Sequence, residues 1–313
     1  MTPPGGRAAG VALGLGAGAL WALAFVGPAQ VEPFGAAEIT LGRFLVFGLC
    51  SVVVLVVRRH DPRRRLDRVD RARIVGLGLA GNTAFFLLLA AAVAVAGSAP
   101  VALVIGALPV AMAVVGNLHR RTVRWAAIAG PALVIAAGIA AAGWAAAVDA
   151  GGSSVWGLAL AGAALASWLV YGLVGATYLA SRPDTDTVLW TSLLGVGTVV
   201  TLPAVGLLVV LDGPDATPDL DAWVALVAWS VVLGVGSSWV ATWMWSRASV
   251  VVPVALLGML IASETVFAVL YAAIVAGRVP PVAQLVGAAL IVGGVTWGAR
   301  ASRERVPVTA APA

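Results

Sequence analysis

The sequence has little of what a soluble enzyme or a metalloprotein needs. It contains one cysteine, two histidines and no lysine, and only 11% of its 313 residues are charged. A single cysteine excludes an internal disulfide and a thiolate metal cage, and His60 and His119 both fall in predicted loops. Soluble domains carry roughly a quarter charged residues. The composition therefore argues against an ordinary soluble domain, and we expect no cofactor and no metal.

What the sequence has instead is a series of long apolar runs, within a composition that is 61% hydrophobic. A helix that crosses a bilayer needs about 20 mostly apolar residues, and ten runs have this length. They cover residues 9–29, 36–57, 74–96, 98–118, 125–148, 155–180, 188–211, 222–245, 250–277 and 280–299. We therefore predict an all-α integral membrane protein with ten transmembrane helices.

The arginines are distributed unevenly over the loops between these runs. With a cytoplasmic N-terminus, 17 of the 19 arginines lie in inner segments, and only Arg43 and Arg278 lie towards the outside. The positive-inside rule follows this asymmetry, so we predict a multi-pass protein of the bacterial inner membrane with both termini in the cytoplasm. The run from Arg58 to Arg73 is interpreted as a topogenic loop. Nucleic-acid binding by this run is not expected, because no aromatic residues interleave with its charges.

The chain divides into two halves of five spans each. We place the first repeat at residues 1–148 and the second at 152–300, followed by a cytoplasmic tail, 301–313, that is predicted to be disordered. Because five is an odd number, the two halves have opposite orientations in the membrane. Inverted repeats of this kind are the framework of many secondary transporters, whose substrate sites lie near the bilayer midplane.

Weak internal similarity supports a duplication. Pro100-Val-Ala-Leu103 in the fourth span recurs as Pro253-Val-Ala-Leu256 in the ninth, and Trp21 in the first span has a counterpart in Trp168 of the sixth. The odd number of crossings in each half is the stronger argument for inversion.

Five short motifs follow one another in a characteristic order along the chain. They are Ala19-Leu-Trp-Ala-Leu-Ala-Phe25, Ile39-Thr-Leu-Gly-Arg-Phe44, Leu108-Pro-Val110, Ser263-Glu-Thr-Val-Phe-Ala268 and Gln284-Leu-Val-Gly-Ala-Ala-Leu-Ile291. In this order they resemble the drug/metabolite transporter superfamily, specifically its ten-span EamA-type branch, over essentially the whole chain. The resemblance implies a transporter, usually an exporter of small metabolites. It also implies that spans one to four and six to nine surround a central cavity, with spans five and ten at the periphery.

The sequence departs from the family pattern at two acidic positions. The family often has Gly-Glu after spans four and nine, where this chain has Gly116-Asn117 and Gly277-Arg278. No role of that acid is therefore carried over to this protein.

One acid lies deep in a predicted span. Glu264 is about fourteen residues into its run, which at ~1.5 Å per residue places it near the bilayer centre. An ionisable group at that depth is costly and is a functional hypothesis by default. We interpret Glu264 as a contact for a substrate amine or as a proton-coupling group, with Tyr271 on the same helical face. The alternative is a neutral structural residue, hydrogen-bonded near Ser263 or Asn82.

Two further polar residues lie within the spans. Arg43, near the outer end of the second span, has two interpretations: a side chain that reaches to the headgroups, or a gate that contacts a carboxylate in the outer vestibule. Asn82, in the third span, is expected to form an interhelical hydrogen bond and is also a candidate for the substrate site.

The tryptophans separate by depth. Those near span ends, including Trp190 and Trp245, fit an interfacial belt. Five aromatic residues are candidates for a cavity that holds a flat or cationic solute, with helix packing as the alternative: Trp21, Phe25, Trp168, Tyr171 and Trp239.

The sequence thus predicts a secondary active transporter. We expect it to export small metabolites, amino-acid-like solutes in particular, or drugs across the inner membrane by alternating access, with proton coupling as the drive considered. Two alternatives stay open: a non-transporting membrane partner protein, and an intramembrane enzyme that acts on lipid-linked substrates, although no enzyme activity is expected. The expected partners are a small-molecule substrate and membrane lipid; a homodimer is kept open, and nucleic acid is not expected.

Overall fold

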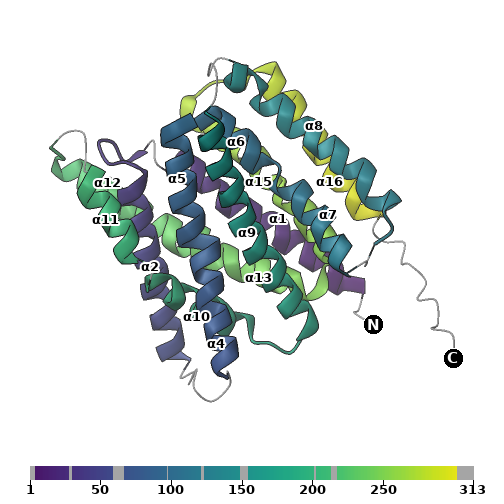
Figure 1. Ribbon diagram of the computed structural model, residues 1–313, viewed down its shortest axis with the longest axis horizontal. Coiled ribbons are helices and arrows are strands. Elements are labelled where there is room, and N and C mark those ends of the chain that lie inside the picture. Colours follow the sequence, from purple (N-terminus) through teal and green to yellow (C-terminus); the bar gives the residue numbers. More distant parts are fainter. Residues whose placement is uncertain are drawn as a thin grey trace.

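The computed structural model describes an all-helical chain. Its described residues are 4–27, 30–58, 67–96, 98–120, 123–148, 154–200, 202–212 and 217–301, and no strand occurs among them. The predicted tail, apart from residue 301, and most of the arginine-rich loop lie outside these ranges. The helices form a bundle in which the first helix begins and the last helix ends on the same side in the view of Figure 1.

The described helices of the first half begin close to where the apolar runs predict. The third span is continuous from α4 through the π-helical segment η2 to α5, and α6 and α7 form the fourth. In chain order they are α1 (Pro4–Val26), α2 (Ala36–Val57), α4 (Arg68–Gly78), η2 (Leu79–Ala84), α5 (Phe85–Ala96), α6 (Ser98–Gly106), α7 (Leu108–Arg120) and α8 (Ala126–Val148).

The second half repeats this order. The eighth span is again interrupted by a π-helical segment, η3, and α14 and α15 form the ninth. The described helices are α9 (Val155–Ser181), α10 (Thr187–Val199), α11 (Leu202–Asp212), α12 (Leu220–Val231), η3 (Val232–Val240), α13 (Ala241–Val251), α14 (Val254–Ile261), α15 (Ser263–Ala276) and α16 (Val282–Ala301).

The lengths of these helices fit a bilayer. Within the described ranges, seven helical stretches are long and apolar enough to cross a membrane, and the pair 187–199 and 202–211, bent by 43°, makes an eighth. Two shorter apolar helices, Val104–Leu118 and Ala126–Ala141, occupy the predicted fourth and fifth spans. Together these stretches occupy all ten predicted positions.

Three aspartates fix where helices begin. The carboxylate of Asp67 accepts a hydrogen bond from the amide of Asp70 at 2.7 Å, and Asp186 caps α10 and Asp219 caps α12 in the same manner. Such caps satisfy amides that have no partner inside the helix. The third span consequently begins at Arg68 rather than at the predicted residue 74, so its first two turns are polar.

Both halves carry the same irregularities at corresponding places. η2 contains Gly81-Asn82-Thr83 and η3 contains Gly236-Ser237-Ser238, and each pair of positions is 155 residues apart. The same separation relates two tight turns, in which Ala107 N donates to Val104 O and Ala262 N donates to Met259 O, both at 3.1 Å. Single π-helical turns inside α-helices frequently mark functional sites.

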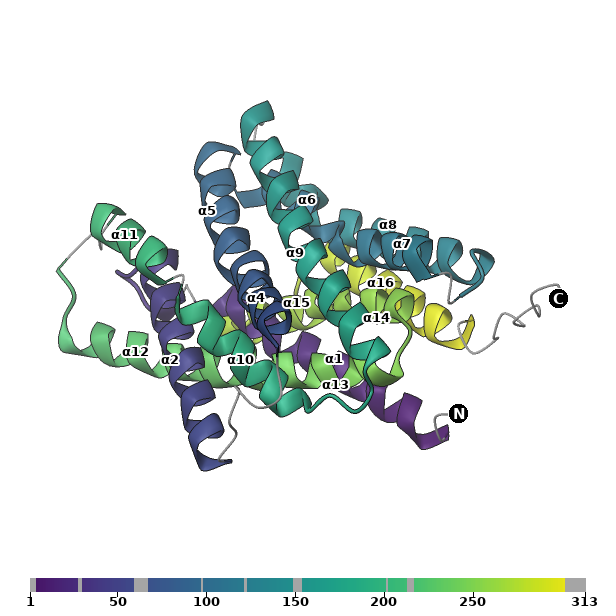
Figure 2. The ribbon, with the colours of Figure 1, turned by 60° about the horizontal axis from the view of Figure 1, so that its bottom comes forward.

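The two halves are interleaved. α1 packs against α13 and α15 of the second half, whereas α9 packs against α5 and α6 of the first. Figure 2 shows α1 running beside α13. The centre of the bundle is therefore built from both halves, and neither half forms a separate body.

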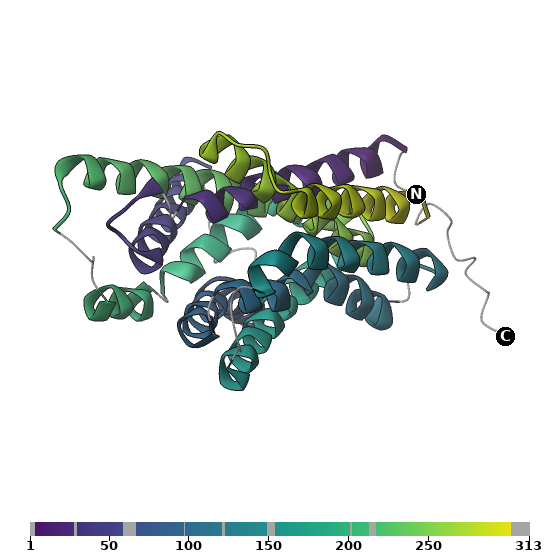
Figure 3. The same ribbon diagram turned by 90° about the horizontal axis from the view of Figure 1, so that it is seen from above.

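α8 and α16 run side by side at one edge of the bundle (Figures 1 and 3). Glycines permit their close approach: a Cβ at Gly138 would lie 2.7 Å from Gly287 O, and one at Gly294 would lie 3.0 Å from Pro131 O. The outer faces are apolar and open, with Leu133 71% exposed and largely available to lipid. The fifth and tenth spans are thus peripheral, as the family resemblance implies.

Candidate functional site

The first helix approaches the ninth span closely where Glu264 lies. A Cβ at Gly14 would lie 2.7 Å from Leu260 Cδ1, and one at Gly18 would overlap Ser263 Oγ and lie 3.2 Å from Glu264 N. Only glycine leaves room for this contact, since any side chain would push the helices apart. The glycine face of α1 thereby positions the junction between α14 and α15, together with the acid in the first turn of α15.

The two groups considered as hydrogen-bond partners for Glu264 bond elsewhere. Ser263 Oγ donates to Leu260 O at 2.7 Å, and Asn82 Nδ2 donates to Thr198 Oγ1 of α10 at 2.9 Å. Within the described part of the chain, the Glu264 carboxylate therefore has no hydrogen-bond partner.

The charged residue that interacts electrostatically with Glu264 is Arg43 of α2. Their side chains are close enough to interact electrostatically, and both lie deep among the helices while part of their surface stays accessible. Arg43 Nε donates to Ser238 Oγ of η3 at 2.7 Å, and its guanidinium carbon lies 5.7 Å from the centre of the Phe44 ring. The guanidinium is thus held inside the bundle, and the interpretation of Arg43 as a side chain reaching to the headgroups is wrong.

Four aromatic rings gather between α1, α9 and α13. Trp21 of α1 lies 6.0 Å from Trp168 of α9 between ring centres, and Trp168 lies 5.6 Å from Tyr171. Trp245 of α13 completes the cluster, at 5.4 Å from Trp21 and 6.1 Å from Trp168. Edge-to-face rings at these distances attract one another, so three helices are joined at this point.

Two tryptophans assigned to the interfacial belt belong to the interior instead. Trp245 is only 3% exposed, because the eighth span continues to Val251 and does not end at the tryptophan. Trp190 is 4% exposed and stacks on Tyr178 with ring centres 4.8 Å apart. For Trp245 the apolar run ends before the helix does, whereas Trp190 lies in the first turn of α10, near the predicted start of the span, and is buried by its contact with Tyr178.

The other predicted site residues divide into those near the cluster and those apart from it. Trp239 of η3 packs, as Trp168 does, against the buried cluster that includes Tyr171, and its Nε1 donates to Ser192 Oγ of α10 at 3.3 Å. Tyr271 pairs with Phe267 along α15, with ring centres 6.1 Å apart. Phe25 is 63% exposed and has no ring partner among the described residues, so the structure does not bring it into the aromatic cluster.

Sequence reasoning missed a second buried acid, Glu38 in the first turn of α2. It is 8% exposed; its Oε2 accepts a hydrogen bond from Gly35 N at 3.0 Å, whereas its Oε1 has no partner among the described residues. A glutamate three residues after a helix N-cap is typical of a capping box, and that spacing could have identified it. Glu38 was not singled out because it lies at the very start of an apolar run, where a polar residue is expected at the helix end.

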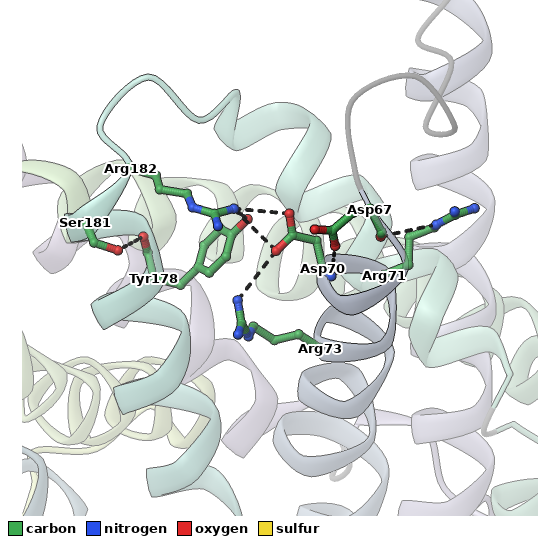
Figure 4. Close-up of polar contacts among 7 residues, drawn as sticks. All are labelled: Asp67, Asp70, Arg71, Arg73, Tyr178, Ser181 and Arg182. Carbon is green, nitrogen blue, oxygen red and sulfur yellow. Dashed lines mark hydrogen bonds and ion pairs between the residues drawn. The ribbon is translucent and has the colours of Figure 1, made fainter.

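A polar cluster at the other end of the bundle was also missed (Figure 4). Arg182 Nη1 donates to Asp70 Oδ1 at 3.3 Å and to Asp70 Oδ2 at 3.1 Å, and it bonds to the Tyr178 hydroxyl. Arg73 Nη1 lies 3.5 Å from Asp70 Oδ1, and both guanidinium groups lie over the Tyr178 ring. The hydrogen bonding of Arg182 to the Asp70 carboxylate, which accepts, raises the pKa of Arg182 above its usual value. The cluster ties the third span to the sixth, across the two halves.

Metal chemistry has no support in this arrangement. No group of three histidine, cysteine, aspartate or glutamate side chains converges among the residues that the structure describes. The centre of the bundle contains instead one acid, one arginine and a set of aromatic rings.

These features define a polytopic membrane protein of the kind that moves solutes: two interleaved halves, broken and π-helical spans, and opposite charges deep in the bundle. A sequence profile of the EamA-like transporter family matches residues 8–142 and again residues 155–297. The chain is 30% identical over 317 residues to "Inner membrane protein YtfF" of Escherichia coli (strain K12), covering 96% of this chain and 97% of that protein. A solved crystal structure with 20% sequence identity has the same fold, with a TM-score of 0.78 over 95% of this chain and 98% of that one. The chain belongs to the EamA-like transporter family, as the five motifs predict.

Proposed function

We propose that this protein is a secondary active transporter that exports small amino-acid-like solutes, or drugs of similar size, across the inner membrane by alternating access. The observation that carries the proposal is the electrostatic interaction between Glu264 and Arg43 inside the bundle, where both side chains keep accessible surface. The relative named "Inner membrane protein YtfF" supports the choice of membrane. The arginine distribution supports cytoplasmic termini.

Opposite charges at one site match the chemistry of a zwitterion. Glu264 would contact the substrate ammonium and Arg43 its carboxylate, because each group is attracted strongly in a water-poor interior. Without substrate, the two protein charges compensate each other, which lowers the cost of keeping them in the membrane. The rings of Trp21 and Trp168 would contact the apolar part of the solute.

Glu264 is also the proposed proton-coupling group. When the carboxylate takes up a proton, it loses its attraction for an ammonium group, so protonation would release the substrate amine. Deprotonation would restore the site. Transport would then depend on a pH difference across the membrane, and a glutamine at this position would remove that dependence.

The two other classes of function make different predictions. An intramembrane enzyme would need a second acid or a nucleophile beside Glu264, whereas the charged neighbour is Arg43. A non-transporting partner protein would show no solute flux at all. We therefore include the absence of catalysis in the proposal.

Solute excretion and drug tolerance in cells that lack the gene test this proposal. The deletion strain is complemented with wild type, Glu264→Gln or the exposed-site control Glu32→Gln, with membrane levels measured for each. We expect wild type and Glu32→Gln to restore export of an amino-acid-like compound, and Glu264→Gln to fail. Export restored equally by Glu264→Gln would make the acid structural. No effect of wild type across a broad panel would contradict transport itself.

A further inference from the structure

A groove lies at the ends of α8 and α16, far from the central site. Its volume is about 520 Å³, and it is lined by Arg124, Ala126, Ala127, Trp297, Arg300 and Ala301. Because α8 and α16 are the peripheral pair of helices, the groove faces the lipid around the bundle. The arginine distribution assigns this end to the cytoplasmic side of the membrane.

The two arginines of the groove come from different halves of the chain and converge on one space. Arg124 precedes the first turn of α8, and Arg300 lies in the last turn of α16. Both side chains are exposed, and neither has an ion-pair or hydrogen-bond partner among the described residues. The arginines of the Asp70 cluster, by contrast, have an acidic partner, because Arg73 and Arg182 share the carboxylate of Asp70. The groove therefore carries two positive charges that the described protein leaves unneutralised.

The wall of the groove is fixed by helix packing. The Trp297 ring lies against Gly130 of α8, where a Cβ would overlap the ring. Trp297 stays 46% exposed, and Trp125, beside Arg124, is 44% exposed. Indole rings favour the level of the lipid headgroups, where one part of the ring is in the apolar region and the N–H is near water. The groove thus combines headgroup-level aromatics, unpaired arginines and small alanines that leave space.

We propose that this groove binds the headgroup of an anionic phospholipid of the cytoplasmic leaflet, with Arg124 and Arg300 on the phosphate. Arginine matches phosphate through paired N–H donors. Basic pockets between transmembrane helices on this side of a membrane are suited to anionic headgroups. The acyl chains would lie along the open apolar faces of α8 and α16, next to Leu133 and Val292, which are 71% and 52% exposed. This site does not depend on the transported solute.

Binding of phosphatidylglycerol to the purified full-length protein in detergent tests the proposal. Thermal unfolding is followed during titration with phosphatidylglycerol, with phosphatidylcholine and with inorganic phosphate. We expect only phosphatidylglycerol to stabilise wild type, and expect Arg124→Gln/Arg300→Gln to weaken its binding about 30-fold, since each arginine near an anionic surface contributes about fivefold. The control Arg68→Gln/Arg278→Gln removes the same charge from exposed positions elsewhere and is expected to bind as wild type does.

Quenching of tryptophan fluorescence supplies a second measurement that does not rely on stability. Phosphatidylglycerol with brominated chains is expected to quench wild type more than brominated phosphatidylcholine does, and Trp297→Phe is expected to lose most of that difference. Equal binding by the groove variant and wild type would overturn the proposal. So would equal loss in the control, which would indicate general attraction to charge. Stabilisation by inorganic phosphate alone would indicate a free-anion site and would also overturn the assignment to lipid.

Discussion

The indole ring of Trp21 meets the indole ring of Trp168 edge to face, with ring centres 6.0 Å apart and ring planes at 85°. The two residues occupy equivalent places in the two segments that match the family, because residues 8 and 155 are separated by the same 147 positions as residues 21 and 168. A residue that contacts its own counterpart lies at the axis that relates the halves. The Trp21–Trp168 pair therefore marks the axis that relates the two halves, where α1 and α9 meet through equivalent aromatic residues.

Replacing Trp168 by alanine is predicted to destabilise the protein. Its ring contacts Trp21, Tyr171 and Trp245, and truncation leaves a gap among three helices. The expected loss is roughly 3 kcal/mol, at the lower end of the range for a truncated aromatic residue. Unfolding in detergent measures it, with Trp156→Ala as a control, because Trp156 is 67% exposed and lies about three turns earlier on the same helix. A similar effect of both variants would contradict the central role of Trp168.

Two neighbouring serines of η3 offer a matched pair of variants. Ser238 Oγ accepts the hydrogen bond from Arg43, whereas Ser237 Oγ is buried without a partner among the described residues. We predict that Ser238→Ala raises the KM for an exported solute several-fold, because Arg43 is no longer fixed in position. Ser237→Ala is predicted to be neutral or slightly stabilising, since it removes an unpaired polar group. Equal KM values for the two variants would argue against a positioning role of Ser238.

Gly18 is predicted to tolerate no side chain. The added Cβ of Gly18→Ala would overlap Ser263 Oγ and press on the backbone of Glu264, so both stability and transport are expected to fall. Gly162 of α9 provides the control, because a Cβ there meets nothing within 4 Å. Gly162→Ala is expected to stabilise the protein by up to about 1 kcal/mol through helix propensity. Thermal unfolding and solute export of the two variants, measured side by side, decide the point.

Reversing the charges of Asp70 and Arg182 is predicted to show whether the two residues form a specific pair. Asp70→Arg would place a third positive charge beside Arg73 and Arg182 and is expected to lower the unfolding temperature. Arg182→Asp would place two acids together, with the same direction of effect. The double variant restores opposite charges and is expected to recover part of the loss. Additive losses in the double variant would mean that the two residues act independently.

Hydrophobic runs predict the spans well because lipid demands about 20 apolar residues in a row. The ends are less predictable, since a helix continues past the apolar run wherever a cap and protein contacts satisfy its backbone. This explains why α4 begins at Arg68, after the Asp67 cap, and why α13 continues to Val251 beyond Trp245. An apolar run predicts which residues contact lipid, but it does not predict the residue at which the hydrogen bonds of the helix end.

The central site was predictable in part. The depth of Glu264 follows from its place in the run, and the offset of the repeats relates Trp21 to Trp168. The partner of Arg43 could not be derived, because Ser238 lies 195 positions away and becomes a partner only through the interleaving of the halves. The same reason hid the contact of Asp70 with Arg182, which are 112 positions apart.

The interleaving of the two halves also shapes the order in which the chain can assemble. α1 is synthesised first, yet the surfaces that contact Gly14, Gly16 and Gly18 belong to Leu260, Met244 and Ser263. During insertion, the glycine face of α1 therefore has no native neighbour until more than three quarters of the chain has been made. The first five spans therefore leave this face of α1 without its native contacts. The eighth and ninth spans, which enter the membrane later, supply these contacts and bring Glu264 to its place beside α1.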